Sequence, residues 1–438
     1  MLLGRMGVAV PAIDAAMQHA YRMSERSQFL VRASYYGARN DAEKALAVLE
    51  MWSTVHPNDP MALRLLTMNY GITRDVPRAL ESIERLLELT PDDVGTLETI
   101  YGVAMHQIDR PDMAIRAAEH WSELTSGEIA PWVALADAQQ EAGNLAAASE
   151  AIERALLLDP AAVDGRRIAA EIAMKQGDFD GAAATYTELM DAARPDSDRF
   201  DAIGGLMILE NRRGRIDRAV ELLAEWEELG RRVAPPGQFA TLLSNRLDIL
   251  VEDGRPDDAR ARIEELRAAM PDPIDGLLAM GATEIATESG DTATARIELA
   301  LLAETVETLN VRVLHPEVHH LRARERLAAG DATAALAATD SVLALDPTLY
   351  GTGRYRARAL LALDRIDDAL EAIEWQLAAD PSHPWALRDR GRILEAAGRR
   401  DDAMASYEAA LEIWSTADPD YRVALETRRE LEALRQKS

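Results

Sequence analysis

Apolar positions recur every three or four residues over most of the chain, the spacing that places them on one face of an α-helix. In residues 353–381, two amphipathic stretches meet at a tight turn and end before a proline. Alanine, leucine and glutamate recur throughout, and aromatic residues make up only 5% of the chain. These features favour packed helices over sheets or disorder, and they predict an all-α protein.

A short unit is repeated along the chain. In six stretches a glycine or an aspartate stands five residues before an alanine, and the same frame extends to five further alanines. The eleven anchor alanines, 34 to 40 residues apart, are Ala45, Ala79, Ala114, Ala148, Ala182, Ala219, Ala259, Ala295, Ala335, Ala369 and Ala403. An apolar or aromatic residue usually follows four and seven positions after the anchor. A proline follows an anchor by twelve positions at Pro57, Pro91, Pro160, Pro271, Pro347 and Pro381.

Each feature of this repeat has a physical reason. A small anchor lets two helices approach closely, a glycine ends the first helix in a left-handed conformation, and a proline prevents the second helix from continuing. One helix pair alone buries only one stripe, and stacked neighbours complete a continuous core. We therefore expect a solenoid whose concave face is lined by the first helices of the repeats.

The frame resembles the tetratricopeptide repeat family, whose unit of about 34 residues is a helix, a turn and a second helix. The resemblance covers roughly residues 26 to 415. It implies a right-handed α-solenoid of about eleven helix-turn-helix repeats with a C-terminal capping helix. A second, weaker resemblance is carried by residues 11–52, which are similar to the start of such arrays in bacterial multidomain signalling proteins, although no kinase motif occurs here.

The frame divides the chain into five segments. They are an N-terminal edge (1–25), repeats 1–5 (26–190), degenerate longer repeats 6–8 (191–315), repeats 9–11 (316–415) and a capping helix (416–438). In the middle the spacings lengthen, and "DAARPDSDR" and "LGRRVAPPGQ" are typical of extended connections, so we expect longer helices or loops and an altered curvature. The last segment repeats no turn and carries charge on most faces, which predicts a solvated cap.

Charge and composition exclude several classes of function. The formal net charge is −27, so a phosphate backbone would be repelled by most of the surface, and a general nucleic-acid binder is not expected. The chain has no cysteine, which excludes disulfides, thiolate nucleophiles and cysteine-based zinc sites. The N-terminal apolar run is interrupted by Pro11 and is too brief for a membrane span, so we expect no membrane insertion and a cytoplasmic location.

No motif supports an enzyme, a metal site or a cofactor. Phosphate-binding loops, nucleophile elbows and dinucleotide fingerprints are absent, and acidic pairs such as Asp367-Asp368 fall where carboxylates cap a helix. The strongest metal candidate is "HPEVHH", which places His315 and His319 four residues apart beside Glu317 and His320. It lacks the HExxH order and a second ligand cluster, so we expect no metal.

Basic residues recur in phase in the last three repeats. Two first-helix positions four residues apart hold His320 and Arg324, then Arg354 and Arg358, then Arg388 and Arg392. Residues four apart share a helix face, so this stripe should climb three adjacent first helices. The family resemblance implies that both positions face the concave groove. Trp385, near the start of a first helix, is a further candidate for the groove, whereas Trp52, Trp121 and Trp226 fall at a packing position.

The arginine stripe has two interpretations. Arginine stands where a carboxylate-clamp pattern would use lysine and asparagine, so the known specificity of such clamps for chaperone tails cannot be carried over. A generic anionic ligand still fits these positions. The alternative is that the arginines pair with acids of adjacent helices, as we expect for the inner set, Arg322, Arg356 and Arg390.

Three functional hypotheses follow. The first is a non-enzymatic scaffold that docks a protein or peptide, of acidic character, in its concave face. The second is a regulatory half that acts with a separate signalling enzyme. The third is an enzyme with a site in residues 190–315. The scaffold predicts salt-sensitive peptide binding and no small deep pocket, whereas the enzyme predicts convergent titratable groups in a cavity. The oligomeric state is left open.

Overall fold

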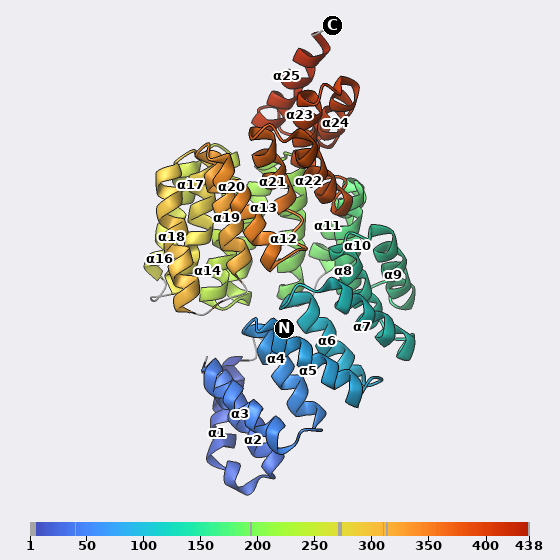
Figure 1. The fold of residues 1–438 in the computed structure, drawn as a ribbon, viewed down its shortest axis with the longest axis vertical. Helices are drawn as coiled ribbons and strands as arrows, with labels where there is room; N and C mark the ends of the chain where they lie inside the picture. The colour runs from blue at the N-terminus through green and yellow to red at the C-terminus, as the bar shows by residue number, and fades with distance from the viewer. Residues whose placement is uncertain are drawn as a thin grey trace. The chain divides into compact units, whose positions relative to one another are not determined.

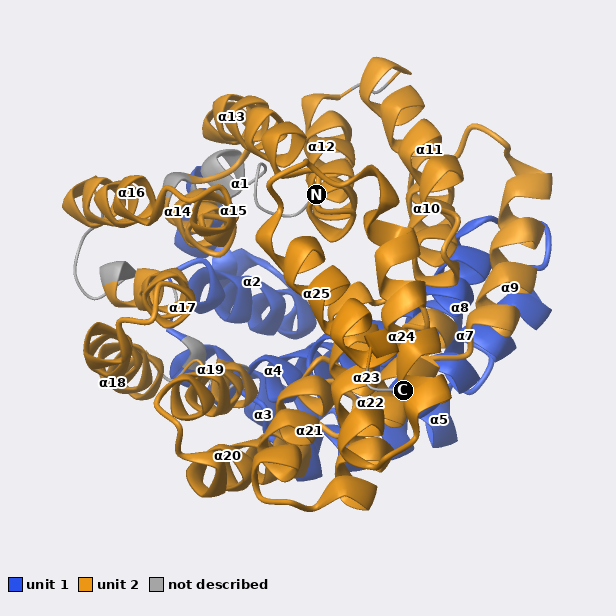
Figure 2. Cartoon of the chain, turned by 90° about the horizontal axis from the view of Figure 1, so that it is seen from above, with its two compact units in different colours: residues 1–138 blue, residues 139–438 orange. Residues whose placement is uncertain are grey.

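The computed structural model describes residues 6–39, 41–192, 195–269, 274–309, 311 and 314–436. These residues form helices joined by turns, without a strand among them (Figure 1). The predicted all-α solenoid of helix pairs is confirmed. The chain divides into two compact units, unit 1 (Met1–Ala138) and unit 2 (Gln139–Ser438), which are described separately (Figure 2).

Unit 1 contains an N-terminal helix and the first three repeats. The helix is α1 (Met6–Gln18), followed by the 3-10 turn η2 (Ala20–Arg22). The pairs are α2 (Glu25–Gly37) with α3 (Ala42–Val55), α4 (Pro60–Ile72) with α5 (Val76–Leu89), and α6 (Val94–His106) with α7 (Pro111–Leu124). Helix α8 (Ala130–Glu141) opens repeat 4 and spans the division. Aspartate side chains accept from free backbone amides at the starts of α3 to α6, which explains where these helices begin.

Unit 2 contains the remaining repeats and the C-terminal helix. Repeats 4 and 5 are completed by α9 (Leu145–Leu158), α10 (Val163–Gln176) and α11 (Phe179–Ala192). Repeats 6 to 8 comprise α12 (Asp196–Arg212), α13 (Ile216–Val233), α14 (Pro236–Ser244), α15 (Asp248–Glu252), α16 (Pro256–Ala269), η3 (Ile274–Leu278), α17 (Ala279–Glu288) and α18 (Thr292–Thr308). Repeats 9 to 11 comprise α19 (His315–Ala328), α20 (Ala332–Leu345), α21 (Thr352–Ala362), α22 (Ile366–Ala379), α23 (Pro384–Ala396) and α24 (Arg400–Ile413). The turn η5 (Trp414–Thr416) leads to α25 (Arg422–Gln436).

The turn inside each repeat has the left-handed backbone that the frame predicts. The residue five positions before the anchor alanine has a positive φ in all ten repeats in which it is described. Seven of these residues are glycines, and the others are Arg74, Asp109 and Asp364. In repeat 1 this position is Asn40, which lies outside the described residues.

The anchor alanines are buried where the two helices of a repeat cross. Ten are 0% exposed and Ala45 is 3% exposed. A larger side chain there would force the helices apart. Trp52, Trp121 and Trp226 are buried, as their position in the frame predicts. The in-phase prolines lie in the turns between repeats, and Pro271 lies outside the described residues.

Repeats 6 to 8 depart from the regular length, as expected. Helices α12, α13 and α18 contain 17, 18 and 17 residues. The first helix is divided into α14 and α15 in repeat 7, and into η3 and α17 in repeat 8. The expected extended connection "LGRRVAPPGQ" was wrong, because α13 continues to Val233, burying Leu229 and Gly230, and α14 begins at Pro236. Part of "DAARPDSDR" lies outside the described residues.

The last repeats of unit 2 return to contact the turns of repeats 4 to 6. These contacts join residues about 200 positions apart and bury polar groups that then need partners. The hydrogen bonds are Ser382 Oγ to Met174 O (2.6 Å), Trp414 Nε1 to Arg212 O (3.2 Å), Tyr350 OH to Ala142 O (3.3 Å) and Asp418 N to Gly214 O (3.0 Å). An ion pair between Arg212 and Asp380 adds to them. Unit 2 is therefore closed by contacts between its early and late repeats.

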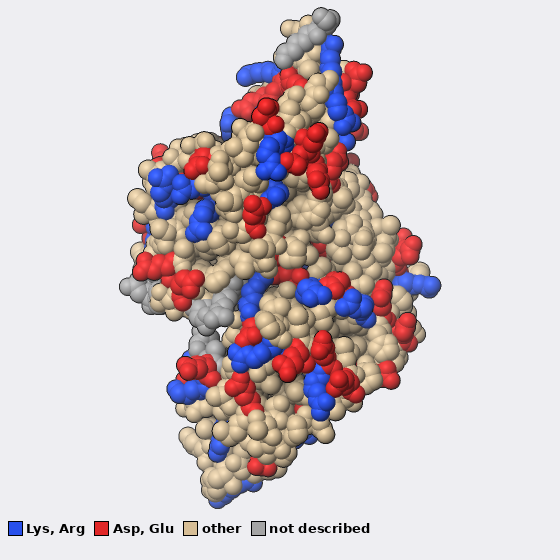
Figure 3. All heavy atoms as spheres, in the orientation of Figure 1, with Lys and Arg blue, Asp and Glu red and all other residues tan. Residues whose placement is uncertain are grey.

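Charges of both signs are interspersed on the face shown in Figure 3. Most described arginines lie within ion-pair distance of a carboxylate on their own or a neighbouring helix, so the net negative charge is not a uniform field. Among the described residues, no helix is both long enough and apolar enough to cross a membrane.

Candidate functional site

The predicted basic stripe lies on a cavity in unit 2. The cavity has a volume of about 450 Å³, within the range of roughly 300–1,000 Å³ typical of ligand pockets. Six of the seven predicted site residues line it: Arg324, Arg354, Arg358, Trp385, Arg388 and Arg392. Arg422 of α25 lines it as well, so six arginines surround one space, which we call the arginine cavity.

His320 is the predicted site residue that does not line the arginine cavity. Its Nδ1 lies 3.0 Å from the Thr352 hydroxyl, and its ring packs edge-on against Tyr355 with the ring centres 5.0 Å apart. Burial, assisted by the positive charge of Arg324, lowers the pKa of His320 to about 3. A neutral imidazole in this position supports the Tyr355 ring rather than adding charge to the cavity.

Arg324 and Arg354 are paired with carboxylates, and both lie close to the Tyr355 ring. Arg324 of α19 pairs with Glu284 and, at 3.0 Å, with Glu288, both on α17. Arg354 Nε donates to Asp389 Oδ2 at 2.6 Å, and this aspartate is buried. Burial opposes ionisation of Asp389, but Arg354 and its neighbours outweigh it and lower the pKa of Asp389. Both guanidinium carbons lie within 6 Å of the centre of the Tyr355 ring, a cation–π distance.

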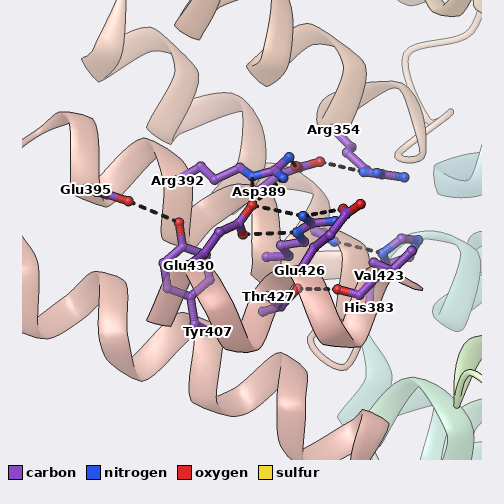
Figure 4. A network of polar contacts seen from close by, with 12 residues as sticks. Arg354, His383, Asp389, Arg392, Glu395, Tyr407, Val423, Glu426, Thr427 and Glu430 are labelled. Atoms are coloured by element: carbon purple, nitrogen blue, oxygen red, sulfur yellow. Dashed lines mark hydrogen bonds and ion pairs between the residues drawn. The ribbon is translucent and has the colours of Figure 1, made fainter. Parts of the chain in front are cut away.

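Arg388 and Arg392 are paired with the C-terminal helix, and Figure 4 shows Arg392 together with Glu426 and Glu430 of that helix. Arg388 donates to Glu426 at 2.9 Å and to both oxygens of Glu430, at 2.9 and 3.1 Å. Arg392 donates to Glu430 at 2.6 Å and to Asp389 at 3.3 Å. Burial raises the pKa of Glu430, but the hydrogen bonds from the two arginines outweigh burial and lower it overall. Helix α25 thus places two carboxylates, one helical turn apart, against two arginines with the same spacing.

Arg358 differs from its neighbours. It is half-buried and lines the arginine cavity, but its guanidinium has no ion pair or hydrogen bond with any residue that the structure describes. Its helix, α21, also carries Arg356, which points elsewhere and pairs with Asp340 of α20. The five donors of the Arg358 guanidinium are therefore available to water or to a ligand.

The inner set of arginines is directed away from the cavity. Arg356 pairs with Asp340, and Arg390 pairs with Glu374 at 2.7 Å, each on the preceding second helix, as expected. Arg322 instead lies 3.1 Å from the Nδ1 of His319. In each of these three repeats, the arginine directed away from the cavity lies two residues before an arginine that lines the cavity.

Trp385 lines the cavity beside two aromatic neighbours. Its ring lies edge-on to His383 (5.5 Å between centres) and to the buried Trp414 (6.2 Å). His383 caps α23, its Nδ1 accepting from the Ala386 amide at 3.1 Å, and burial followed by the charges of Arg212 and Arg354 lowers the pKa of His383 well below its usual value. The aromatic part of the cavity is consequently held rigidly.

Nine of the fifteen lining residues were missed by the sequence analysis. Four of the nine come from repeats 6 to 8, namely Asn211, Asp248, Glu252 and Glu288. Counted from the anchor alanine, Asp248 has the same register as Arg324, Arg358 and Arg392, and Glu252 and Glu288 lie one turn further on. Extending the frame backward from repeat 9 would have found these acids. The irregular length of repeats 7 and 8 concealed them.

The three histidines of "HPEVHH" have separate partners. His315 lies 3.3 Å from Glu307, His319 contacts Arg322 and His320 contacts Thr352. The described residues contain no group of three or more histidine, cysteine, aspartate or glutamate side chains that could hold a metal ion.

The chemistry of the arginine cavity is that of charge recognition. Titratable groups do converge in it, which is the feature expected of an enzyme, but half of them are arginines, which stay protonated and cannot transfer protons. His383 is engaged in capping its helix. The remaining donors and acceptors are suited to binding a charged group.

Comparison with known proteins identifies the repeat. The model of the tetratricopeptide repeat family matches residues 133–198 and 356–421, and the second match includes Arg358, Trp385, Arg388 and Arg392. No curated protein is a significant match.

Solved structures resemble the chain at low identity. The crystal structure of the APC/C hetero-tetramer Cut9–Hcn1 is 12% identical, with 96% of this chain and 85% of that chain covered and a TM-score of 0.47. A tetratricopeptide repeat protein from Parabacteroides merdae ATCC 43184 is 14% identical, with 58% and 97% covered and a TM-score of 0.45. MamA from Desulfovibrio magneticus RS-1 is 20% identical, with 39% and 96% covered and a TM-score of 0.34.

Proposed function

Because the chain is a tetratricopeptide repeat protein, we propose that it is a non-enzymatic scaffold that binds an acidic segment of a partner protein in the arginine cavity. Repeats of this family stack into surfaces suited to extended or helical segments. In the cavity, guanidinium groups on three consecutive first helices offer planar donors to carboxylates.

Arg358 is the observation that carries this proposal. Its neighbours Arg324, Arg354, Arg388 and Arg392 are all paired with carboxylates of the protein itself, whereas Arg358 is not. The charge of Arg358 helps to lower the pKa of Asp389, but Arg358 forms no ion pair with any described carboxylate. In a chain with a formal net charge of −27, such a half-buried arginine is available for a carboxylate from outside. Because Arg358 is half-buried, its attraction for a carboxylate is screened less than that of a fully exposed arginine.

The proposal is tested by calorimetric titration of an acetylated, amidated peptide that repeats Glu-Ala. Arg358→Gln should weaken its binding about tenfold, because a hydrogen bond to a charged group contributes about 1.5–3 kcal/mol and tenfold corresponds to about 1.4 kcal/mol. Raising the salt concentration should weaken binding to the wild type, since exposed charges are screened over roughly 8–10 Å.

Arg356→Gln is the matched control. It removes the same charge from the same helix, at a residue that pairs with Asp340 outside the cavity, and it should leave the affinity within about twofold of the wild type. Equal affinities of wild type and Arg358→Gln, or absence of binding to the wild type, would contradict the proposal.

A further inference from the structure

The arginine cavity has a second, acidic wall. Asp248 and Glu252 on α15 and Glu288 on α17 line the same space as Arg354, Arg358, Arg388 and Arg392 on α21 and α23. The first helices of consecutive repeats thus present acids in repeats 7 and 8 and bases in repeats 9 to 11. Arg324 lies where the two groups meet and pairs with Glu284 and Glu288.

Two carboxylates of the acidic wall form no ion pair with a described residue. Glu288 is paired with Arg324, whereas neither Asp248 nor Glu252 forms an ion pair with a residue in the described part of the chain. Asn211 of α12 also lines the cavity, and its buried Oδ1 receives no hydrogen bond from the described residues. Asp248 Oδ1 accepts from the Ile249 amide at 3.0 Å, but neither carboxylate is neutralised by an ion pair with a described residue. Both line the cavity that also contains the unpaired donors of Arg358.

The carboxylates of the acidic wall repel one another. The low-dielectric surroundings, followed by the carboxylates of Asp248 and Glu288, raise the pKa of Glu252. Burial, followed by the Glu284 carboxylate, likewise raises the pKa of Asp248. A cation placed between these carboxylates would remove the repulsion and satisfy their lone pairs.

We propose that the arginine cavity takes a partner segment of mixed charge, with a lysine or arginine on Asp248 and Glu252 and a carboxylate on Arg358. This inference rests on the proposed function and narrows its ligand. A purely acidic segment can pair with Arg358, but it brings further negative charge towards Asp248 and Glu252. A purely basic segment can pair with these two carboxylates, but it is repelled by the arginines of the basic wall. The two walls together select by repulsion as well as by attraction.

The experiment compares three acetylated, amidated peptides of equal length, which repeat Glu-Lys, Glu-Ala or Lys-Ala. The wild type should bind the Glu-Lys peptide about tenfold more tightly than the Glu-Ala peptide, since one additional charge-assisted contact contributes about this much. The double variant Asp248→Asn/Glu252→Gln should lose this preference while it binds the Glu-Ala peptide at least as well as the wild type does. Arg358→Gln should weaken binding of both the Glu-Lys and the Glu-Ala peptide.

A matched control removes two carboxylates elsewhere in unit 2. Glu304 of α18 and Glu371 of α22 are exposed and lie on second helices, outside the residues that line the cavity. Glu304→Gln/Glu371→Gln should retain the tenfold preference for the Glu-Lys peptide, which separates the local effect from the change in net charge.

The possible failures are distinguishable. If the wild type binds Glu-Ala as tightly as Glu-Lys and the double variant behaves like the wild type, the mixed-charge inference is overturned while acidic binding stands. If Arg358→Gln affects neither peptide, the proposed function fails and this inference fails with it. Tightest binding of the Lys-Ala peptide would also overturn both.

Discussion

Single residues show how far the local pattern determines this structure. The positive φ at Gly143 and its equivalents was predictable, because glycine adopts this conformation without the penalty that a Cβ brings. The positive φ at Arg74 was not, since a long side chain disfavours it. There the side chain pairs with Asp109, which occupies the same turn position in the next repeat. The exception depends on a contact between repeats, which a pattern within one repeat does not contain.

The pattern within one repeat also predicts only part of the candidate site. The register of Arg354, Arg358, Arg388 and Arg392 was readable from the sequence, because it follows the repeat frame. Which of these arginines is paired was not readable, since Asp389 lies one repeat further on and Glu430 lies beyond the repeats.

His320 makes a prediction about pH at this scale. Its pKa is about 3 in the folded protein and 6.5 in the reference state, so the unfolded chain takes up a proton that the folded protein does not. Stability should therefore fall as the pH drops from 6.5 towards 3, by up to about 1.36 kcal/mol per pH unit for this group. His320→Gln should reduce that slope, because up to one proton fewer is taken up on unfolding. The check is the urea midpoint measured from pH 7 to pH 4, and parallel curves for the two proteins would contradict the assignment.

At the scale of elements, the repeat frame predicted the helix pairs but not the role of the last helix. The sequence predicted a solvated cap for residues 416–438, and α25 does carry charge on its exposed face. It also buries Leu431 and Leu434 against Tyr407 of α24 and delivers Glu426 and Glu430 to the arginines of α23. A helix outside the frame has no register from which its contacts could be read.

Helix α25 should compete with an acidic ligand. Its two glutamates pair with Arg388 and Arg392, so Glu426→Gln/Glu430→Gln removes the charged partners of Arg388 and leaves Arg392 with Asp389 alone. The double variant should bind the Glu-Ala peptide several-fold to about tenfold more tightly than the wild type, as measured by calorimetry. It should also be less stable, because Arg388 is only 8% exposed and loses its partners. Unchanged or weaker peptide binding would mean that a ligand does not reach these arginines.

At the scale of the whole molecule, the contacts between early and late repeats of unit 2 could not be predicted from the sequence. A period of 34 residues indicates that neighbours stack, but the point at which the chain meets itself depends on the small rotation of each repeat and on the extra turns of α12, α13 and α18. The resulting hydrogen bonds, such as Ser382 to Met174, join repeats far apart in the sequence. The arginine cavity also combines distant parts of unit 2, since Asn211 of repeat 6 and Arg422 of α25 line it together.

The central claim is that partner segments bind inside this cavity, and photo-crosslinking tests it most directly. A Glu-Lys peptide with one benzophenone-bearing residue is irradiated with the full-length protein, and the attachment sites are identified by mass spectrometry. We predict crosslinks within α21, α23 and α25, at residues such as Tyr355, Trp385 and Val423 that line the cavity, and their loss in Arg358→Gln but not in Arg356→Gln. Crosslinks confined to unit 1 or to the second helices of unit 2, or equal labelling in the two variants, would contradict the claim.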